Sequence, residues 1–310
     1  MNMRSAQRRA LIEKKRKTVK FTGLFLKFIL PALLILVVLV IFKFSTKYWN
    51  GTDKFAFTYK LDSGDVAVNV LDPKLGELTT LVIPGDTQVE VARNYGELRI
   101  KNVWQLGINE KIGGKLLAET VTQGFLFPVF LWSSKDANAL VAGNTFGLLR
   151  FIFFPESTNI SFWDRVSAGL FAMRVGDSGK SSLDLGKNQF LVKRKLNDGL
   201  MGYILGGTIS PRLTVYFADN SFADKNVRVA IKDATGTSEV AGKVVQIIEV
   251  LVGKVVAIDK KTVADTDCKV FGTAEGAVKK VAEIFSCKVG KNAGDFDLEI
   301  DLGSAFAKRF

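Results

Sequence analysis

Residues 21–42, FTGLFLKFILPALLILVVLVIF, form an almost continuous apolar run. At about 1.5 Å rise per residue, a helix of this length spans the roughly 30 Å hydrocarbon core of a bilayer. Lys27 lies near the start of the run, where its ammonium group reaches the headgroups, and Pro31 is tolerated in membrane helices. A buried core helix is the alternative interpretation. We predict a single transmembrane helix over residues 21–43.

Basic residues are concentrated before this run. Residues 1–20 hold eight Lys or Arg and one acidic residue, Glu13, whereas only Lys43 and Lys47 follow in the next few positions. Positive charge stays on the cytoplasmic side, so we expect a cytoplasmic N-terminus and extracytoplasmic domains in the cell membrane. A cleaved signal peptide is the alternative, but the run exceeds the usual 7–15 residues or so and no small-x-small site follows. An uncleaved signal anchor is therefore expected.

Composition narrows the possible partners and chemistry. Residues 1–50 hold 11 of the 43 Lys and Arg residues and only one acidic residue, so they account for +10 of the net charge of +12. This basic block suits contact with anionic inner-leaflet lipids. No nucleic-acid partner is expected, because a short arm cannot build a DNA-binding fold. The chain has no histidine, which excludes a Ser-His-Asp triad and His-ligated zinc.

After a polar stalk at residues 44–54, the pattern predicts a mixed α+β fold in two domains, residues 55–220 and 226–310. In the first domain, alternation predicts a mixed sheet with strands at 55–60, 66–71, 78–83, 129–132 and 212–217. Helices are expected at about 100–109 and 113–123, and a mixture of helix and strand at 136–207. Gly113 and Gly114 are interpreted as a helix-start junction, since the other residues of a phosphate-binding loop are missing.

The second domain has a clearer pattern. Strands are expected at 227–231, 254–259, 267–271 and 296–302, with helices at 274–285 and after Thr237 or Ser238. In the last strand, apolar residues alternate with Asp297, Glu299 and Asp301, which predicts one buried and one strongly acidic face. Two helices on one small sheet is the expected architecture.

The order of elements after residue 226 resembles the LytR C-terminal domain. The matching residues are Val227 and Val229, Thr235-Gly236, Ala241, Thr273-x-x-Gly276, Leu302-Gly303 and Phe306-Ala307. Two positions depart from the family pattern: Asp233 stands where Asn is usual, and Ala305 where Asp is common.

Residues 63–132 are similar to the opening of the LytR/CpsA/Psr catalytic domain, whose members transfer lipid-linked phosphoglycans to the cell wall. The matching segments are Gly64-Asp65, Leu71-Asp72-Pro73, Ile83-Pro84-Gly85-Asp86-Thr87, Ile100-Lys101-Asn102 and Gly113-Gly114-Lys115-Leu116-Leu117 with Thr120-Val121. The resemblance implies a polyprenyl-phosphate glycan or a cell-wall polymer as partner.

The resemblance also implies candidate site residues. Asp65 and Asp86 keep the family's carboxylate positions, which hold a divalent cation such as Mg²⁺ beside a pyrophosphate. Lys101 and Asn102 match a further segment, and we include Arg99 with them as candidate ligand-binding residues. The alternative for both carboxylates is structural, because each lies at an ordinary turn position.

One departure bears on activity: Gly85 stands where the family has an arginine. A single arginine can contribute about 10³–10⁵ in the rate of phosphoryl transfer. We therefore expect a non-catalytic binder of lipid-linked or wall glycans. One alternative is an active Mg²⁺-dependent phosphotransferase that uses an arginine from elsewhere, the candidates being Arg93, Arg99, Arg150, Arg165 and Arg174. Another is an envelope scaffold that binds only proteins.

The two cysteines, Cys268 and Cys287, flank one expected strand and helix of the second domain. A chain that returns from a crossover helix commonly lies beside the strand it left, which brings such residues within disulfide reach. The expected compartment is oxidising, so we predict a disulfide between them. The alternative is two small buried hydrophobic residues.

Overall fold

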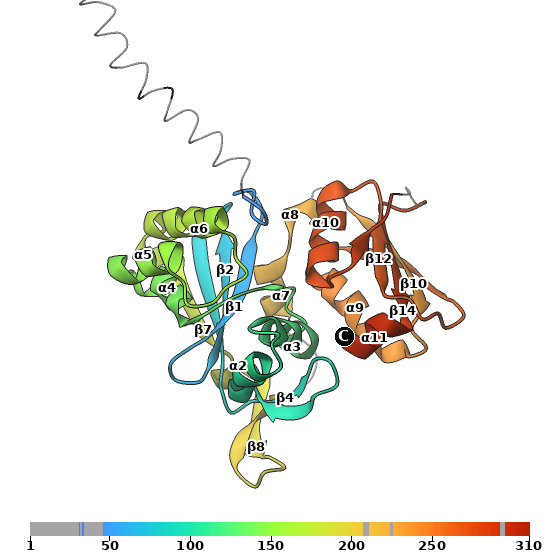
Figure 1. Cartoon of the computed structure of the whole chain (residues 1–310), viewed down its shortest axis with the longest axis horizontal. Helices are drawn as coiled ribbons and strands as arrows, with labels where there is room; N and C mark the ends of the chain where they lie inside the picture. The colour runs from blue at the N-terminus through green and yellow to red at the C-terminus, as the bar shows by residue number, and fades with distance from the viewer. Residues whose placement is uncertain (1–30, 32, 34–45, 207–210, 224–225, 292–294) are drawn as a thin grey trace, which may run out of the picture. The chain divides into compact units, whose positions relative to one another are not determined.

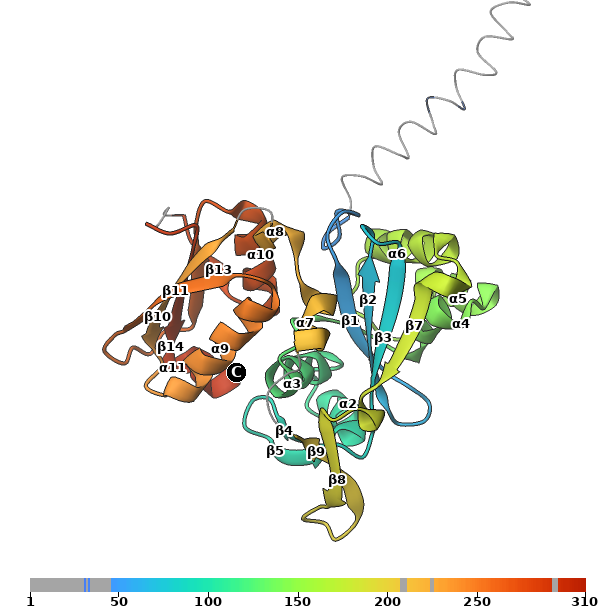
Figure 2. The same ribbon diagram turned by 180° about the vertical axis from the view of Figure 1, so that it is seen from behind.

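The computed structural model describes residues 31, 33, 46–206, 211–223, 226–291 and 295–310. Residues 48–310 form one compact unit that contains two five-stranded mixed sheets (Figures 1 and 2). Apart from residues 31 and 33, the expected transmembrane segment lies outside the description. Within the described ranges, no helix is long and apolar enough to cross a bilayer.

The first sheet is built around the antiparallel hairpins that alternation predicts. Its strands, in spatial order, are β6 (Leu131–Ser133), β1 (Phe55–Lys60), β2 (Val66–Asp72), β3 (Glu77–Ile83) and β7 (Lys180–Asp184). Val68 in the central strand pairs with Thr58 on one side and Leu81 on the other. The edge strands β6 and β7 run parallel to β1 and β3.

Both faces of this sheet are covered by helices. Val66, Val68 and Val70 pack in a core with α2 (Ile100–Asn109) and α3 (Lys115–Phe125). Successive strand residues point to opposite faces, so Phe57 and Leu71 belong to the core beneath α4 (Ala139–Ala142), α5 (Thr145–Phe153) and α6 (Phe162–Arg174). The first sheet is therefore the middle of three layers, as Figure 1 shows.

Helices α2 and α3 cross at glycines. A Cβ atom at Gly107 of α2 would collide with the Gly113 carbonyl oxygen, so the two backbones are in close contact there. Gly114 is the residue before α3, and a Cβ at that position would lie 2.6 Å from the Trp104 ring. The predicted helix-start junction at Gly113 and Gly114 is thus confirmed.

Helix α6 begins at the N-cap residue Ser161. Ser161 accepts a hydrogen bond from the Asp164 amide and donates one to the Asp164 carboxylate, at 3.2 and 2.6 Å. The same buried carboxylate accepts main-chain hydrogen bonds from Tyr48 (3.1 Å) and Trp49 (3.2 Å). Asp164 therefore joins the first residues of the compact unit to the start of α6.

Two expectations about this region are wrong or incomplete. Residues 212–217, expected as a strand, belong to the helix α7 (Pro211–Phe217). Proline favours the first turn of a helix, and Leu213 and Phe217 are buried four residues apart while Val215 is exposed, which is a helical spacing. Two hairpins were not predicted, β4 (Gln88–Val91) with β5 (Gly96–Arg99) and β8 (Leu191–Lys195) with β9 (Met201–Leu205).

The second sheet follows the expected pattern closely. Its strands, in spatial order, are β11 (Lys254–Lys260), β10 (Arg228–Ala234), β14 (Leu298–Gly303), β12 (Cys268–Phe271) and β13 (Lys288–Val289). Helices α9 (Ser238–Val250) and α10 (Glu275–Ile284) pack on one face around Ile231 and Ile300. Two short helices went unpredicted, α8 (Asn220–Ala223) and α11 (Ser304–Arg309).

The acidic face expected for residues 296–302 is only partly exposed. Strand β14 is central in its sheet, so both of its long edges are paired. Glu299 is buried and forms an ion pair with Lys232 of β10, at 2.8 Å. Burial raises the pKa of the Asp301 carboxyl, which lies on the same face. Lys232 of the neighbouring strand therefore neutralises part of this face.

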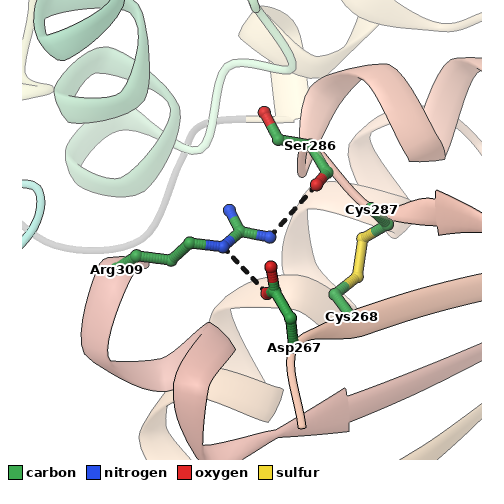
Figure 3. The surroundings of a disulfide bond; sticks show 5 residues. All are labelled: Asp267, Cys268, Ser286, Cys287 and Arg309. Carbon is green, nitrogen blue, oxygen red and sulfur yellow. Dashed lines mark hydrogen bonds and ion pairs between the residues drawn. A yellow bond between two sulfur atoms is a disulfide. The ribbon is translucent and has the colours of Figure 1, made fainter. Parts of the chain in front are cut away.

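A disulfide joins Cys268 at the start of β12 to Cys287, which follows α10; their Cα atoms are 4.7 Å apart (Figure 3). Arg309 of α11 lies beside it. Its Nε donates to the Asp267 carboxylate at 2.9 Å, and its Nη2 donates to the Ser286 carbonyl at 3.3 Å. The C-terminal helix is thus fixed to the residues that precede both cysteines.

Replacing Gly107 by alanine is expected to destabilise the protein by about 1–3 kcal/mol, because the new methyl group must displace the Gly113 backbone. Gly242 in α9 is the matched control, since it is exposed and a Cβ there meets nothing within 4 Å. Gly242→Ala should stabilise by about 0.5–1 kcal/mol through helix propensity. Denaturant unfolding measures both; equal stabilisation by the two changes would contradict the close crossing.

The disulfide predicts that protein purified without reductant has no alkylatable thiol and an intact mass lower by two hydrogens. Reduction should lower the free energy of unfolding by about 3 kcal/mol, the chain-entropy value for a loop of this size. A Cys268→Ser, Cys287→Ser double variant should not respond to reductant. Two thiols that react without prior reduction would show that the bond is absent from the folded protein.

Candidate functional site

The site is organised around the loop Pro84–Thr87, which follows β3. Gly85 at its centre is held on both sides. Its amide donates a 2.7 Å hydrogen bond to the Asp65 carboxylate, which lies just before β2. Its carbonyl accepts from the Lys101 amide at 3.1 Å, in the first turn of α2. The loop therefore brings together the start of β2, the end of β3 and the start of α2.

Position 85 has no room for a side chain. A Cβ atom there would lie 2.6 Å from the Gly64 carbonyl oxygen and 3.2 Å from the Lys101 Cβ. The first of these contacts is with backbone, which cannot move aside as a flexible side chain can. The arginine that the motif resemblance would place here is thus missing from the sequence, and the Gly64 backbone occupies the space where its side chain would begin.

Two cationic side chains, those of Lys101 and Arg99, bind the Asp86 carboxylate. Its Oδ1 accepts hydrogen bonds from Lys101 Nζ at 2.6 Å and from Arg99 Nη1 at 2.8 Å. About half of the Asp86 and Lys101 side-chain surface remains exposed, whereas only 11% of Arg99 does. The Lys101 ammonium, followed by the Arg99 guanidinium, lowers the pKa of Asp86. The Asp86 carboxylate is therefore ionised at neutral pH, and both it and the Lys101 ammonium are accessible to solvent.

The β8–β9 hairpin completes this cluster. Arg99 Nε and Nη2 bind the two Asp198 carboxylate oxygens at 2.7 and 3.0 Å, and this fork lowers the Asp198 pKa to about 2. Strand β9 reaches the loop through Gly202, where a Cβ would lie 2.5 Å from the Asp86 carbonyl oxygen. The partner strand β8 carries three consecutive exposed basic residues, Lys193, Arg194 and Lys195.

A cavity of about 370 Å³ opens beside Arg99. Six of its eight lining residues are polar or charged; the lining consists of Gln88, Glu97, Leu98, Arg99, Asn102, Leu196, Asn197 and Asp198. Asn102 therefore contributes to this cavity. The structure places the three predicted ligand-binding residues at one end of α2, with Arg99 and Lys101 on the Asp86 carboxylate and Arg99 and Asn102 at the cavity.

The two carboxylates predicted to hold Mg²⁺ have other partners. The oxygens of Asp65 accept hydrogen bonds from the Gly85 amide and from Ser63 Oγ at 2.7 and 2.8 Å. The Asp86 carboxylate is bound by the Lys101 ammonium and the Arg99 guanidinium, and these positive charges repel a divalent cation. Across the described part of the chain, no group of three or more acidic or cysteine side chains is arranged to hold a metal. Both carboxylates are thus engaged by groups of the protein itself, and the Mg²⁺ site stays a prediction.

Of the arginines considered as substitutes for the missing one, Arg99 contacts Asp86. Three others are engaged elsewhere: Arg93 with Glu119 at 2.6 Å, Arg150 with Asp136 at 2.9 Å, and Arg165 with the Ile152 and Ile160 carbonyls at 3.1 and 2.8 Å. A cluster of guanidinium groups at the loop is therefore not formed by these residues.

Sequence reasoning missed Asp198 and the basic hairpin. Asp198 follows Arg99 by 99 positions, and no pattern in the intervening residues predicts that they meet. The run Lys193-Arg194-Lys195 was visible, and together with the turn Asn197-Asp198-Gly199 it could have indicated an exposed basic hairpin.

No protein-family model matches this chain, and no curated protein matches it in sequence. Among solved structures, Bacillus subtilis TagT is similar over 51% of this chain and 87% of its own, with 14% identity and a TM-score of 0.35. B. subtilis TagV is similar over 67% of this chain and 100% of its own, with 11% identity and a TM-score of 0.37. A third structure, described as a LytR-CPS2A-psr family protein with bound octaprenyl pyrophosphate lipid, covers 51% of this chain and 86% of its own at 13% identity and a TM-score of 0.33. The similarity to these three structures is distant and covers half to two thirds of this chain.

Proposed function

We propose that this chain is a membrane-anchored, extracytoplasmic protein of the cell envelope that binds a lipid-linked or wall glycan through its phosphate groups and does not transfer it. The observation that carries the proposal is the loop at Pro84–Thr87. Two cations meet at the solvent-accessible carboxylate of Asp86, while the neighbouring position 85 is closed by backbone.

The binding part of the proposal rests on charge and access. Lys101 is about 42% exposed, so its ammonium can exchange part of its contact with Asp86 for a contact with an incoming phosphate. Arg99 is already fixed by Asp198, which pre-organises its guanidinium group. Lys193, Arg194 and Lys195 on the adjoining hairpin add positive charge that attracts a polyanionic glycan.

The non-catalytic part rests on what surrounds the anion. Phosphoryl transfer is accelerated mainly by cations and guanidinium groups placed around the developing charge. Here Arg99 is divided between Asp86 and Asp198, and Arg93, Arg150 and Arg165 have partners elsewhere. The two candidate metal ligands are occupied by an amide, a hydroxyl and cationic groups. These observations favour capture of the ligand over turnover.

The anchoring part rests on the sequence. The apolar run at 21–42, preceded by eight basic residues, would hold the outer domain beside the membrane in which lipid-linked glycans are presented. The rival scaffold function would use a protein partner and would need no phosphate-binding residues.

We expect the full chain in detergent micelles to bind a short-chain polyprenyl pyrophosphate and not the corresponding polyprenol. Lys101→Gln should weaken binding about fivefold, since an exposed ion pair contributes up to about 1 kcal/mol. The control is Lys74→Gln, which removes an exposed lysine from the turn at the opposite end of β2 and should leave the affinity unchanged. Equal affinity for pyrophosphate and polyprenol, or equal loss in both variants, would exclude this site.

Asp86→Asn separates the binder from the metal-dependent enzyme by the sign of its effect. If Asp86 only holds the two cations, removing its charge frees them for the ligand, and pyrophosphate affinity without Mg²⁺ should rise about threefold. If Asp86 holds Mg²⁺, binding measured with Mg²⁺ should fall instead. Titration calorimetry with and without Mg²⁺ distinguishes the two results.

Restoring the motif arginine by Gly85→Arg should not create activity. The new Cβ must displace the Gly64 backbone, so we expect destabilisation by about 1–3 kcal/mol and no transferase activity. Gly76→Arg serves as control, because a Cβ atom at that turn meets nothing within 4 Å, although its φ of +68° carries a backbone cost of its own. A stable Gly85→Arg protein with activity would show that the loop opens readily.

A further inference from the structure

Helices α5 and α6 present an apolar surface on the outside of the first sheet. Throughout the described ranges, phenylalanine is exposed at four positions only, and all four lie here: Phe146, Phe153, Phe154 and Phe162. Phe146 and Phe154 are the most exposed, at 78% and 79%. Leu149, Leu170 and Met173 extend the same pair of helices with further exposed apolar side chains. We call these seven residues the α5–α6 apolar surface.

The aromatic part of this surface is concentrated where α5 ends and α6 begins. Ring centroids of Phe153 lie 6.4 Å from Phe154 and 5.8 Å from Phe162, and Phe162 lies 5.1 Å from Trp163. The Arg165 guanidinium lies 5.9 Å from the Phe162 ring centre, and Arg174 is exposed at the end of α6. Large apolar groups gathered on a protein surface mark an interaction site, and aromatic rings beside arginine are typical of a membrane–water interface.

The start of α6 is also the point to which the beginning of the compact unit is fixed. Asp164 accepts the Tyr48 and Trp49 amides, and the Trp49 ring lies 5.7 Å from Phe171 of the same helix. In Figures 1 and 2, the blue segment before β1 runs beside α6. Residues 43–47 alone separate Tyr48 from the apolar run at 21–42, and five extended residues reach at most about 18 Å.

We propose that the α5–α6 apolar surface inserts into the outer interface of the bilayer, so that the protein contacts the membrane with a folded face as well as through its anchor. The inference rests on the membrane anchoring proposed above. Because Asp164 fixes Tyr48 to the start of α6, an anchor that ends near residue 42 keeps Phe162 and its aromatic neighbours within reach of the headgroups. Arg174, which is exposed at the end of α6, adds positive charge that would attract anionic phospholipids.

The test uses the full chain in vesicles of zwitterionic and anionic phospholipids. Since both native cysteines are joined in a disulfide, Phe154→Cys supplies a single free thiol for an environment-sensitive fluorophore. Met173→Cys is a second probe on the same surface, and Leu200→Cys, equally exposed and apolar but on the β8–β9 turn, is the control. Alkaline extraction of the same vesicles reports anchoring independently of the probes.

In vesicles that retain the chain after extraction, the probes at 154 and 173 should be blue-shifted and quenched by lipids with shallow spin labels several-fold more than the probe at 200. Equal quenching at all three positions would overturn the inference and leave the anchor intact. If neither the probe at 154 nor the probe at 173 is quenched, and residues 154 of two copies can be cross-linked, the surface binds a second copy of the chain. That result would also overturn the inference. Release of the chain by alkaline extraction would remove the anchor and the inference together.

Discussion

The arrangement of the candidate site depends on the backbone contact between Gly64 and Gly85. The Gly85 amide donates to Asp65, its carbonyl accepts from the Lys101 amide, and its missing side chain lets the Gly64 carbonyl approach to a distance that no Cβ could share. Three elements that are separate in sequence are thereby held at one loop. The same contact that fixes the loop beside Asp86 also leaves no room for a side chain at position 85, so the shape of the loop and the absence of an arginine there have one cause.

The electrostatics of the site follow from this loop. Asp86 projects beside the first turn of α2, where Arg99 and Lys101 converge on it, and Asp198 holds the far side of the Arg99 guanidinium. The cations are thus pre-organised but partly neutralised, which suits reversible binding of an anion better than stabilisation of a transition state. The basic β8 strand and the α5–α6 apolar surface lie on other elements, so the proposed attraction of a polyanion and the proposed contact with a bilayer can each be tested without changing the loop.

Much of the fold was predictable because local patterns and tertiary packing agree. The sequence pattern matches the observed structure for the strands β2 and β10, for the helices α9 and α10, and for the glycine junction before α3. The strand predicted for residues 212–217 was wrong, because the sequence RLTVYF fits both the strand period and the helix period. The helix buries Leu213 and Phe217 together. For the site, the motif resemblance located Asp65, Asp86 and Lys101. It could not supply Asp198, whose meeting with Arg99 depends on how a distant hairpin pairs, or the Gly64 contact, which depends on backbone geometry.

The most direct test of this account is a turnover measurement on the full chain in lipid vesicles. The protein would be incubated with a polyprenyl-pyrophosphate-linked glycan, an acceptor glycan and Mg²⁺, and free polyprenyl phosphate would be quantified over time. With the loop closed at Gly85, the account predicts saturable binding of intact lipid-linked glycan and no release of polyprenyl phosphate above the protein-free rate, with or without Mg²⁺. Mg²⁺-dependent release that disappears in Asp86→Asn would contradict it.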